Sequence, residues 1–205
     1  MRNLFLLLLI SLLTLSIGTP SNAIEFPWKK QEQKVEIDPT SEQARVLYAQ
    51  NDIDGALKLL QSKGEMTRSA EDWLLIGNIM QDKDRLNEAV YMFKKAIEVD
   101  PKYYKAHYNL GYIYLTQDKP NMALAEFKQA VKYKDDFAYG YYNMGCAYLQ
   151  LKQYRNARYN FFRALDAKGD EPAIYYNLAY TFKMLNNEKQ AKIYYDLYNK
   201  IMERQ

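Results

Sequence analysis

The chain of 205 residues contains a single cysteine and a single histidine. Cys146 therefore has no partner for a disulfide within the chain. With His107 it supplies only two soft ligands, whereas a structural zinc site takes four. The sequence also lacks a glycine-rich phosphate loop and a Gly-x-Ser-x-Gly elbow. These absences leave no catalytic, metal or cofactor site to name, and we expect a protein that is not an enzyme.

An excess of basic charge is also missing. Lysine and arginine number 28 and aspartate and glutamate 25, which gives a formal net charge of +3. A dedicated nucleic-acid binder needs a strong positive field, so we expect no nucleic-acid partner. The short basic run of Lys128, Lys132 and Lys134 is interpreted as a solvated helix face.

Long apolar runs are absent except for one, from Leu4 to Ile17. Arg2 precedes this run, and Gly18, Pro20 and Ser21-Asn22-Ala23 follow it. A basic start, an apolar stretch of 7–15 residues and small residues before a cut are typical of a secretory signal peptide. We predict a signal peptide over residues 1–23 and an exported protein in the periplasm or secreted space.

The alternative is an uncleaved anchor that keeps the chain on the extracytoplasmic side of a membrane. A membrane-spanning helix needs about 20 apolar residues, and this run is shorter. Trp28-Lys29-Lys30 would nevertheless suit an interfacial anchor, so the alternative stays open. Residues 24–40 contain Pro27, Pro39 and a polar charged stretch, and we predict a flexible tether there.

A regular repeat is the main positive feature. Alanine recurs every thirty-four residues and is followed four residues later by an aromatic residue. The pairs are Ala89 with Phe93, Ala123 with Phe127, Ala157 with Phe161, and Ala191 with Tyr195. A fixed period of this length indicates stacked supersecondary units.

A second set of columns lies upstream of each alanine. A bulky ring (Trp73, His107, Tyr141, Tyr175) is followed three residues later by an aliphatic residue and then by Gly77, Gly111, Gly145 or Ala179. This spacing is typical of one face of a helix. Glycine inside a helix costs about 1 kcal/mol relative to alanine, so its recurrence indicates a close helix crossing. Each unit is predicted to be a hairpin of two helices.

These motifs resemble the tetratricopeptide repeat pattern of Trp-x-x-Leu-Gly-x-x-Tyr, then Ala-x-x-x-Phe, then Pro. The resemblance implies an all-α, right-handed solenoid of antiparallel helix hairpins with about four repeats and a degenerate N-terminal one. The closing proline is present only as Pro101, and Tyr198 replaces an alanine in the last repeat, which suggests an end cap. The predicted repeats are a degenerate unit at 41–69 and full units at 70–103, 104–137, 138–171 and 172–205.

The two reactive side chains have ordinary interpretations. His107 occupies the column of Trp73 and Tyr141, so we expect it to pack and not to act as a base. Cys146 is expected to be half-buried beside tyrosines, although an intermolecular disulfide or a reactive thiol stays open. The two columns lie five residues apart on the first helix of the hairpin. That separation turns them by roughly 140° and argues against a Cys-His pair.

The resemblance further implies a concave groove, lined by the first helix of each hairpin, in which partner segments bind. Tyrosine and asparagine columns fill these positions. We expect Tyr108 with Tyr112, and Tyr176 with Tyr180, to form aromatic patches beside the asparagines. Asparagine amides could hold a peptide main chain, or the same side chains could simply pack between repeats. The candidate groove residues are Asn78, Lys105, Tyr108, Asn109, Tyr112, Tyr142, Asn143, Cys146, Tyr176, Asn177 and Tyr180.

The family's chaperone-tail clamp grips a C-terminal carboxylate with lysines, an arginine and asparagines. Here Leu74, Tyr139 and Asn143 stand where the two lysines and the arginine are expected, and only Lys105 is a nearby cation. The resemblance therefore favours an uncharged or aromatic-bearing segment over an acidic tail.

We expect a protein-interaction scaffold that takes part in complex assembly or secretion. The alternative is a self-assembling or membrane-tethered component that acts through a C-terminal face around Leu197, Tyr198 and Ile201.

Overall fold

The computed structural model describes residues 38–169 and 171–204, and this part of the chain contains ten α-helices, one short 3-10 helix and no strand. The predicted signal peptide and the predicted tether up to residue 37 lie outside the described residues. The α-helices are α1 (Pro39–Ala49), α2 (Ile53–Ser62), α3 (Ala70–Asp82), α4 (Leu86–Val99), α5 (Tyr104–Thr116), α6 (Pro120–Tyr133), α7 (Ala138–Gln150), α8 (Tyr154–Asp166), α9 (Pro172–Met184) and α10 (Glu188–Met202). The 3-10 helix η1 (Glu65–Thr67) joins α2 to α3.

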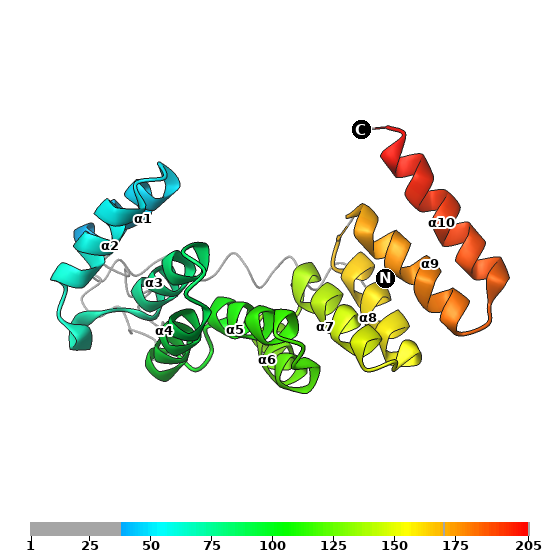
Figure 1. Cartoon of the computed structure of the whole chain (residues 1–205), viewed down its shortest axis with the longest axis horizontal. Coiled ribbons are helices and arrows are strands. Elements are labelled where there is room, and N and C mark those ends of the chain that lie inside the picture. The colour runs from blue at the N-terminus through cyan, green and yellow to red at the C-terminus, as the bar shows by residue number, and fades with distance from the viewer. Residues whose placement is uncertain (1–37, 170, 205) are drawn as a thin grey trace, which may run out of the picture. The chain divides into compact units, whose positions relative to one another are not determined.

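Consecutive helices pair into five hairpins, from α1 with α2 to α9 with α10 (Figure 1). The first helix of each hairpin is called the A helix and the second the B helix. Each B helix also packs against the A helix that follows it, so the hairpins stack in chain order. This all-α, right-handed solenoid confirms the fold predicted from the repeat, and α1–α2 is the degenerate first unit.

The glycine of each A helix makes room for an aromatic ring of the same hairpin. The pairs are Gly77 with Phe93, Gly111 with Phe127, and Gly145 with Phe161. A Cβ on Gly111 would lie 2.8 Å from Cδ1 of Phe127 and 3.2 Å from the carbonyl oxygen of Ala123. The phenylalanines are fully buried. The predicted close crossing is therefore present, and each of these glycines chiefly meets the phenylalanine ring of the B helix.

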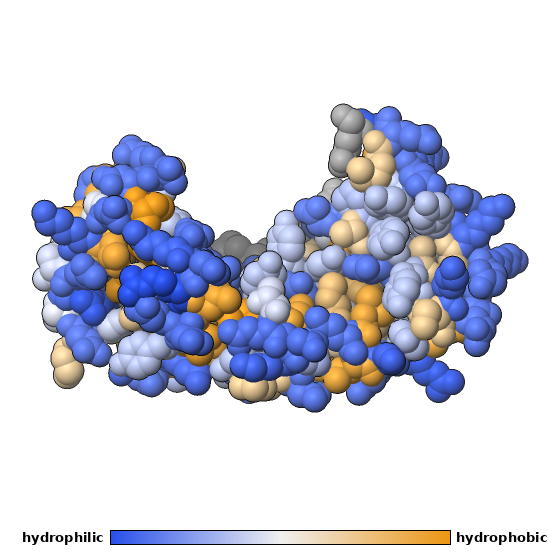
Figure 2. Space-filling view, in the orientation of Figure 1, coloured by the Kyte–Doolittle hydropathy of each residue, from blue (hydrophilic) through white to orange (hydrophobic). Residues whose placement is uncertain are grey.

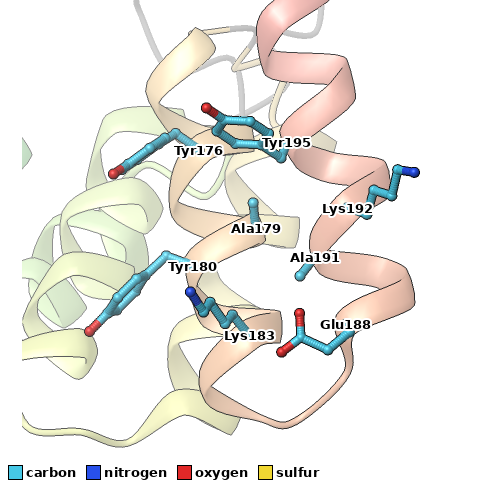
Figure 3. Close-up of a pocket in the computed structure, with 8 residues that line it drawn as sticks. All are labelled: Tyr176, Ala179, Tyr180, Lys183, Glu188, Ala191, Lys192 and Tyr195. Atoms are coloured by element: carbon cyan, nitrogen blue, oxygen red, sulfur yellow. The ribbon is translucent and has the colours of Figure 1, made fainter.

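The fourth full hairpin departs from this arrangement. Ala179 stands in the glycine column, and Tyr195, in the phenylalanine column, is 48% exposed, whereas Phe161 is completely buried. No hairpin follows α10 within the described residues to cover this ring. Figure 3 shows the aromatic side chain of Tyr195 beside Tyr176, above Ala179 and Ala191. A hollow is left between α9 and α10 at this end of the stack.

The turn inside each hairpin has one conformation. The backbone N–H that starts the B helix donates to a carbonyl five residues earlier, as in the bond of 2.9 Å from Lys119 to Tyr114. The residue before that donor has a positive φ, which is the Schellman ending of an α-helix. These positive-φ residues are Asn51, Asp84, Asp118, Lys152 and Asn186. Asparagine and aspartate tolerate this conformation best, which explains four of the five.

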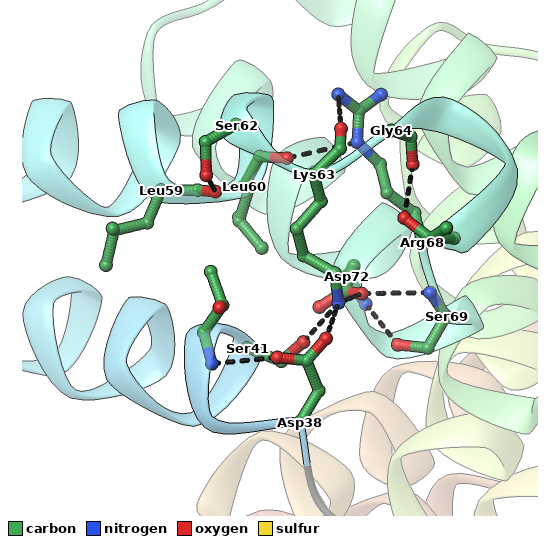
Figure 4. A network of polar contacts seen from close by, with 12 residues as sticks. Asp38, Ser41, Leu59, Leu60, Ser62, Lys63, Gly64, Arg68, Ser69 and Asp72 are labelled. Atoms are coloured by element: carbon green, nitrogen blue, oxygen red, sulfur yellow. Dashed lines mark hydrogen bonds and ion pairs between the residues drawn. The ribbon is translucent and has the colours of Figure 1, made fainter.

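A buried polar network joins the first hairpin to the second (Figure 4). Lys63 donates to Asp72 at 2.6 Å and to Ser41 at 2.6 Å, and it also contacts Asp38 at 2.9 Å. Asp72 and Ser69 form a capping box that begins α3. The side chain of Asp38 accepts from the N–H of Thr40, which starts α1 at Pro39. The last two residues of the predicted tether, 39 and 40, are therefore helical instead.

Among the described helices, none is both long and apolar enough to cross a bilayer. Hydrophilic side chains cover most of the surface seen in Figure 2, with smaller hydrophobic areas between them. Residues of intermediate hydropathy, the range in which tyrosine falls, gather over α7, α9 and α10.

Candidate functional site

The side chains between the packing columns of α3, α5, α7 and α9 form one surface, which we call the A-helix face. All eleven candidate groove residues lie on these helices. Lys105, Tyr112, Tyr176 and Tyr180 are exposed, and Asn143 is buried at 7% exposure. The remaining six, Asn78, Tyr108, Asn109, Tyr142, Cys146 and Asn177, are half-buried. The predicted set therefore combines an exposed tyrosine layer with a deeper asparagine layer.

The asparagines bond from one repeat to the preceding one. Nδ2 of Asn143 donates to the hydroxyl of Tyr108 at 3.0 Å, and Nδ2 of Asn177 donates to the hydroxyl of Tyr142 at 3.1 Å. Each bond reaches back thirty-five residues. The tyrosine and asparagine columns are therefore one hydrogen-bonded ladder that links successive A helices.

The ladder changes where the tyrosine column ends. Leu74 takes the tyrosine position in α3 and offers no hydroxyl. Asn109 instead donates from Nδ2 to Oδ1 of Asn78 at 2.7 Å. Each asparagine thus finds a partner on the preceding A helix, and the chemistry of that partner depends on the side chain available there.

The carbonyl side of each of these asparagines makes no hydrogen bond within the described residues. Within the described residues, Oδ1 of Asn109, Asn143 and Asn177 accepts no hydrogen bond, yet every buried side-chain nitrogen or oxygen atom there has a partner. Each of these three oxygens therefore keeps some solvent-accessible surface. An amide held by one N–H presents its remaining N–H and its carbonyl oxygen in a defined direction, which matches the needs of a peptide main chain.

The tyrosine rings pack sideways and do not pair along the helix. Tyr108 meets Phe137 with ring centroids 4.9 Å apart, and Tyr142 meets Phe161 at 5.8 Å. No ring contact joins Tyr108 to Tyr112, or Tyr176 to Tyr180, anywhere in residues 38–169 and 171–204. The predicted patches therefore do not rest on ring contacts along one helix, because Tyr108 and Tyr142 pack against the B helix or the connection between hairpins. Their hydroxyls still reach the asparagines.

Tyr139, which the sequence placed at a clamp position but left out of the candidate groove residues, belongs to this face. It is 52% exposed and lies one helical turn before Asn143 on α7. Its hydroxyl donates to Oε1 of Glu171 at 3.1 Å. The position is thirty-four residues after Lys105, so the column itself was available in the sequence. Tyr139 extends the exposed tyrosine layer of Tyr112, Tyr176 and Tyr180.

Cys146 lies in the deeper layer, half-buried beside Tyr142 and Asn177. Nδ2 of Asn177 approaches its Sγ at 4.0 Å. Burial raises the pKa of the Cys146 thiol to about 11, although a hydrogen bond with Tyr142 lowers it in part. Such a thiol stays protonated near neutral pH and is a poor nucleophile. The structure favours the packing interpretation of this residue over the reactive one.

His107 is part of the hydrogen bonding of its own hairpin. Its exposed fraction is 6%, its Nδ1 lies 2.8 Å from Oε2 of Glu126, and its Nε2 lies 3.1 Å from the carbonyl oxygen of Pro101. Burial acts to lower the pKa of His107, but the bonds to Glu126 and Pro101 outweigh it and the pKa is raised. Both ring nitrogens face acceptors, so the doubly protonated ring fits this site best. His107 therefore packs in the expected position and also forms an ion pair with Glu126.

The part of the chain that the structure describes holds no group of three or more histidine, cysteine, aspartate or glutamate side chains placed to bind a metal. Its chemistry is that of tyrosine hydroxyls, asparagine amides and apolar rings. Groups of this kind are able to bind peptide groups and apolar side chains.

Comparisons with known proteins agree with this architecture. A family model described as TPR repeat matches residues 77–118, and one described as tetratricopeptide repeat matches residues 104–137 and 138–170. These segments therefore carry tetratricopeptide repeats. A search of curated proteins finds no match.

Solved structures of MamA share the fold. MamA from Desulfovibrio magneticus RS-1, residues 41 to the end, has a TM-score of 0.72 at 18% identity, covering 82% of this chain and 98% of that one. A second crystal structure of MamA has a TM-score of 0.72 at 19% identity, covering 83% and 98%. A MamA structure from AMB-1 has a TM-score of 0.69 at 14% identity, covering 80% and 90%. Identities this low show the fold alone.

Proposed function

We propose that this chain is a non-catalytic interaction scaffold that holds an extended segment of a partner protein on its A-helix face. The observation that carries the proposal is the asparagine ladder of Asn109, Asn143 and Asn177. Each amide is fixed by a bond to the preceding A helix, and that of Asn177 also approaches Sγ of Cys146. Within the described residues none of the three Oδ1 atoms accepts a hydrogen bond. Fixed amides at regular intervals suit a ligand that also repeats regularly, which is a peptide main chain.

The surrounding side chains define the ligand. Tyr112, Tyr139 and Tyr180 are exposed and can cover apolar or aromatic side chains of the segment at little cost in rotamer entropy. Among the candidate groove residues, Lys105 is the one that carries a positive charge. A partner segment with few charges and several large apolar residues fits this surface best.

The place of action is part of the same proposal. The apolar run from Leu4 to Ile17, followed by Ser21-Asn22-Ala23, supports export to the periplasm or secreted space. A retained segment would instead hold the scaffold on the extracytoplasmic face of a membrane. Sequencing the mature N-terminus from the native host decides between them: a start at Ile24 supports release, and an intact Met1 supports the anchor.

Peptide display on the folded chain tests the groove. Peptides that bind the parent protein are selected from a random library. The affinity of the tightest-binding peptide is then measured for the parent and for the variants Asn143→Ala and Tyr108→Phe. Both variants lose the bond between these two residues, but only the first removes the amide offered to the ligand. We expect Asn143→Ala to weaken binding by at least about tenfold and Tyr108→Phe to change it little. Equal losses in both variants would show that the asparagine serves only the fold.

A further inference from the structure

The open end of the solenoid carries a second candidate surface. Between α9 and α10 lies a hollow of about 400 Å³ lined by Tyr176, Ala179, Tyr180, Lys183, Glu188, Ala191, Lys192 and Tyr195 (Figure 3). On the hairpins before it, the corresponding side is covered by the next A helix, as α7 covers α6 and α9 covers α8. The hollow therefore continues the series of stacking interfaces, and within the described residues no helix fills it.

The lining of the hollow is suited to another helix. Ala179 and Ala191 are small and form its floor, while Tyr176, Tyr180 and Tyr195 stand exposed at about half of their surface. Small residues permit close approach of a helix backbone, and tyrosines supply contact area that also tolerates water. Lys183 stands in the column that holds the apolar Leu115 and Leu149 in the preceding hairpins. The occupant must therefore be amphipathic.

A stripe of alternating charge runs along α10 beside the hollow. Glu188, Lys192, Asp196 and Lys200 are spaced four residues apart, and all four are exposed. None of them takes part in an ion pair within the described residues. Figure 3 shows the side chain of Lys192 extending away from α9, where another molecule can reach it.

This stripe is complementary to itself when two copies of α10 run antiparallel. With the two-fold axis at the level of Tyr194, Glu188 of one copy faces Lys200 of the other, and Lys192 faces Asp196. Ala191 and Tyr195 lie beside Glu188 and Lys192 on the side of α10 that lines the hollow. All four charged residues find an opposite charge, and each contact occurs twice because a two-fold interface repeats itself.

We propose that the occupant of the hollow is α10 of a second copy, packed antiparallel in this register to form a two-fold dimer. Stacking of the first hairpin of another copy onto this end is disfavoured, because α1 exposes Glu42 and Gln43. Val46 is its one large apolar side chain that is exposed, so α1 would bring little apolar surface to the hollow. The proposal concerns α10 and does not depend on peptide binding at the A-helix face.

Light scattering over a range of concentrations tests the dimer, with the full chain from Ile24 and two exposed single substitutions. Lys192→Glu places an acid opposite Asp196 of the partner copy, and Asp196→Lys places a lysine opposite Lys192. We expect each variant alone to dimerise at least about tenfold more weakly than the parent, since facing like charges are unfavourable across an interface. Circular dichroism spectra should match the parent, because both side chains are exposed.

The decisive sample is an equimolar mixture of the two variants. In the mixed dimer the glutamate introduced by Lys192→Glu faces the lysine introduced by Asp196→Lys, and the native Asp196 of the first variant faces the native Lys192 of the second. The expected result is therefore a return of the dimer to near the parental affinity, which charge effects inside a single helix cannot produce. A parent that stays monomeric at all concentrations would overturn the proposal, and so would a dimer that neither variant weakens. Tyr176 and Tyr180 line both the hollow and the A-helix face, so peptide affinity is compared with every sample diluted to the monomer. There it should be the same in all samples, and a failure to dimerise leaves the proposed function standing.

Discussion

Asn143 on α7 donates a hydrogen bond from Nδ2 to the hydroxyl of Tyr108 on α5, 3.0 Å away, and so links two successive A helices. The same relationship recurs between Asn177 and Tyr142 at 3.1 Å. In each pair one N–H of the amide serves the stack of hairpins, while the carbonyl oxygen keeps some solvent-accessible surface. The sequence left packing and ligand binding open as interpretations. The packing interpretation applies to Nδ2, and ligand binding at Oδ1 stays a prediction.

The first prediction concerns the contribution of this bond to stability. Tyr108→Phe and Asn143→Ala should each lower the free energy of unfolding by about 0.5–2 kcal/mol, the usual net contribution of one hydrogen bond with some lost packing. The double variant should cost less than the sum of the two single variants, because both remove the same interaction. Urea unfolding measures all three. Strict additivity would mean that the two side chains do not act together.

The second prediction concerns the glycine column. Gly111→Ala places a Cβ 2.8 Å from Phe127 and 3.2 Å from the backbone oxygen of Ala123, which cannot move freely. We expect a loss of about 1–3 kcal/mol despite the better helix propensity of alanine, and several kcal/mol for Gly111→Leu. Ala179→Gly is the matched control, since the ring of Tyr195 is exposed. It should cost only about 1 kcal/mol through propensity. Thermal unfolding that leaves Gly111→Leu unchanged would disprove the assigned register.

The fold could be predicted from the sequence because the recurring glycine and alanine residues have a steric reason, which is close packing between helices. A glycine such as Gly77 is unfavourable in a helix unless a partner lies close, so its period predicts the hairpins and their stacking. The bond from Asn143 to Tyr108 was not predictable, since it depends on the axial offset between α5 and α7 and on two rotamers. The ion pair of His107 with Glu126 was missed for the same reason. It joins α5 to α6, and the repeat pattern in the sequence does not show how these two helices are rotated relative to each other.

The third prediction concerns the turn between α7 and α8. Lys152 has a φ of 56°, a conformation that costs a lysine more than an asparagine. Lys152→Asn should raise the free energy of unfolding by roughly 0.5–1 kcal/mol. Asp118 occupies the equivalent position with the same φ of 56° and already tolerates it, so Asp118→Asn should change stability little. A gain of equal size in both variants, measured by urea unfolding, would exclude relief of backbone strain as the cause.

The fourth prediction is a pH dependence centred on His107. Its pKa is raised in the folded state above the ordinary value of 6.5. The charged ring therefore stabilises the fold fully below 6.5, and this contribution is lost as the pH rises through the raised pKa. Over this rise in pH the free energy of unfolding should fall by about 1–2 kcal/mol, which is the usual contribution of one hydrogen bond to a charged group. The comparison is urea unfolding of the parent and His107→Gln from about pH 6 to about pH 9. An unchanged pH slope in the variant would assign the effect to other groups.

The fifth prediction concerns the attachment of the first hairpin. The side chains of Lys63 and Asp72 are only 8% and 2% exposed. Lys63→Met leaves a buried carboxylate without its cation, and we expect a loss of about 3–5 kcal/mol together with faster hydrogen exchange in α1 and α2. Lys83→Met is the control, because Lys83 contacts Asp54 at 2.8 Å but Asp54 is 88% exposed. That variant should cost less than about 1 kcal/mol. Similar losses in both would contradict a burial-dependent role for Lys63.

Site-specific photocrosslinking in the native host tests the central claim most directly. A photoreactive phenylalanine analogue replaces Tyr112 on the A-helix face, or, as controls, Tyr91 or Tyr159 on the B helices, which are more exposed than Tyr112. We expect one recurrent partner peptide to crosslink at position 112, to disappear when Asn143→Ala is added, and to be absent from positions 91 and 159. Crosslinks of equal yield at all three positions, or a crosslink at 112 that survives Asn143→Ala unchanged, would contradict a peptide-binding A-helix face.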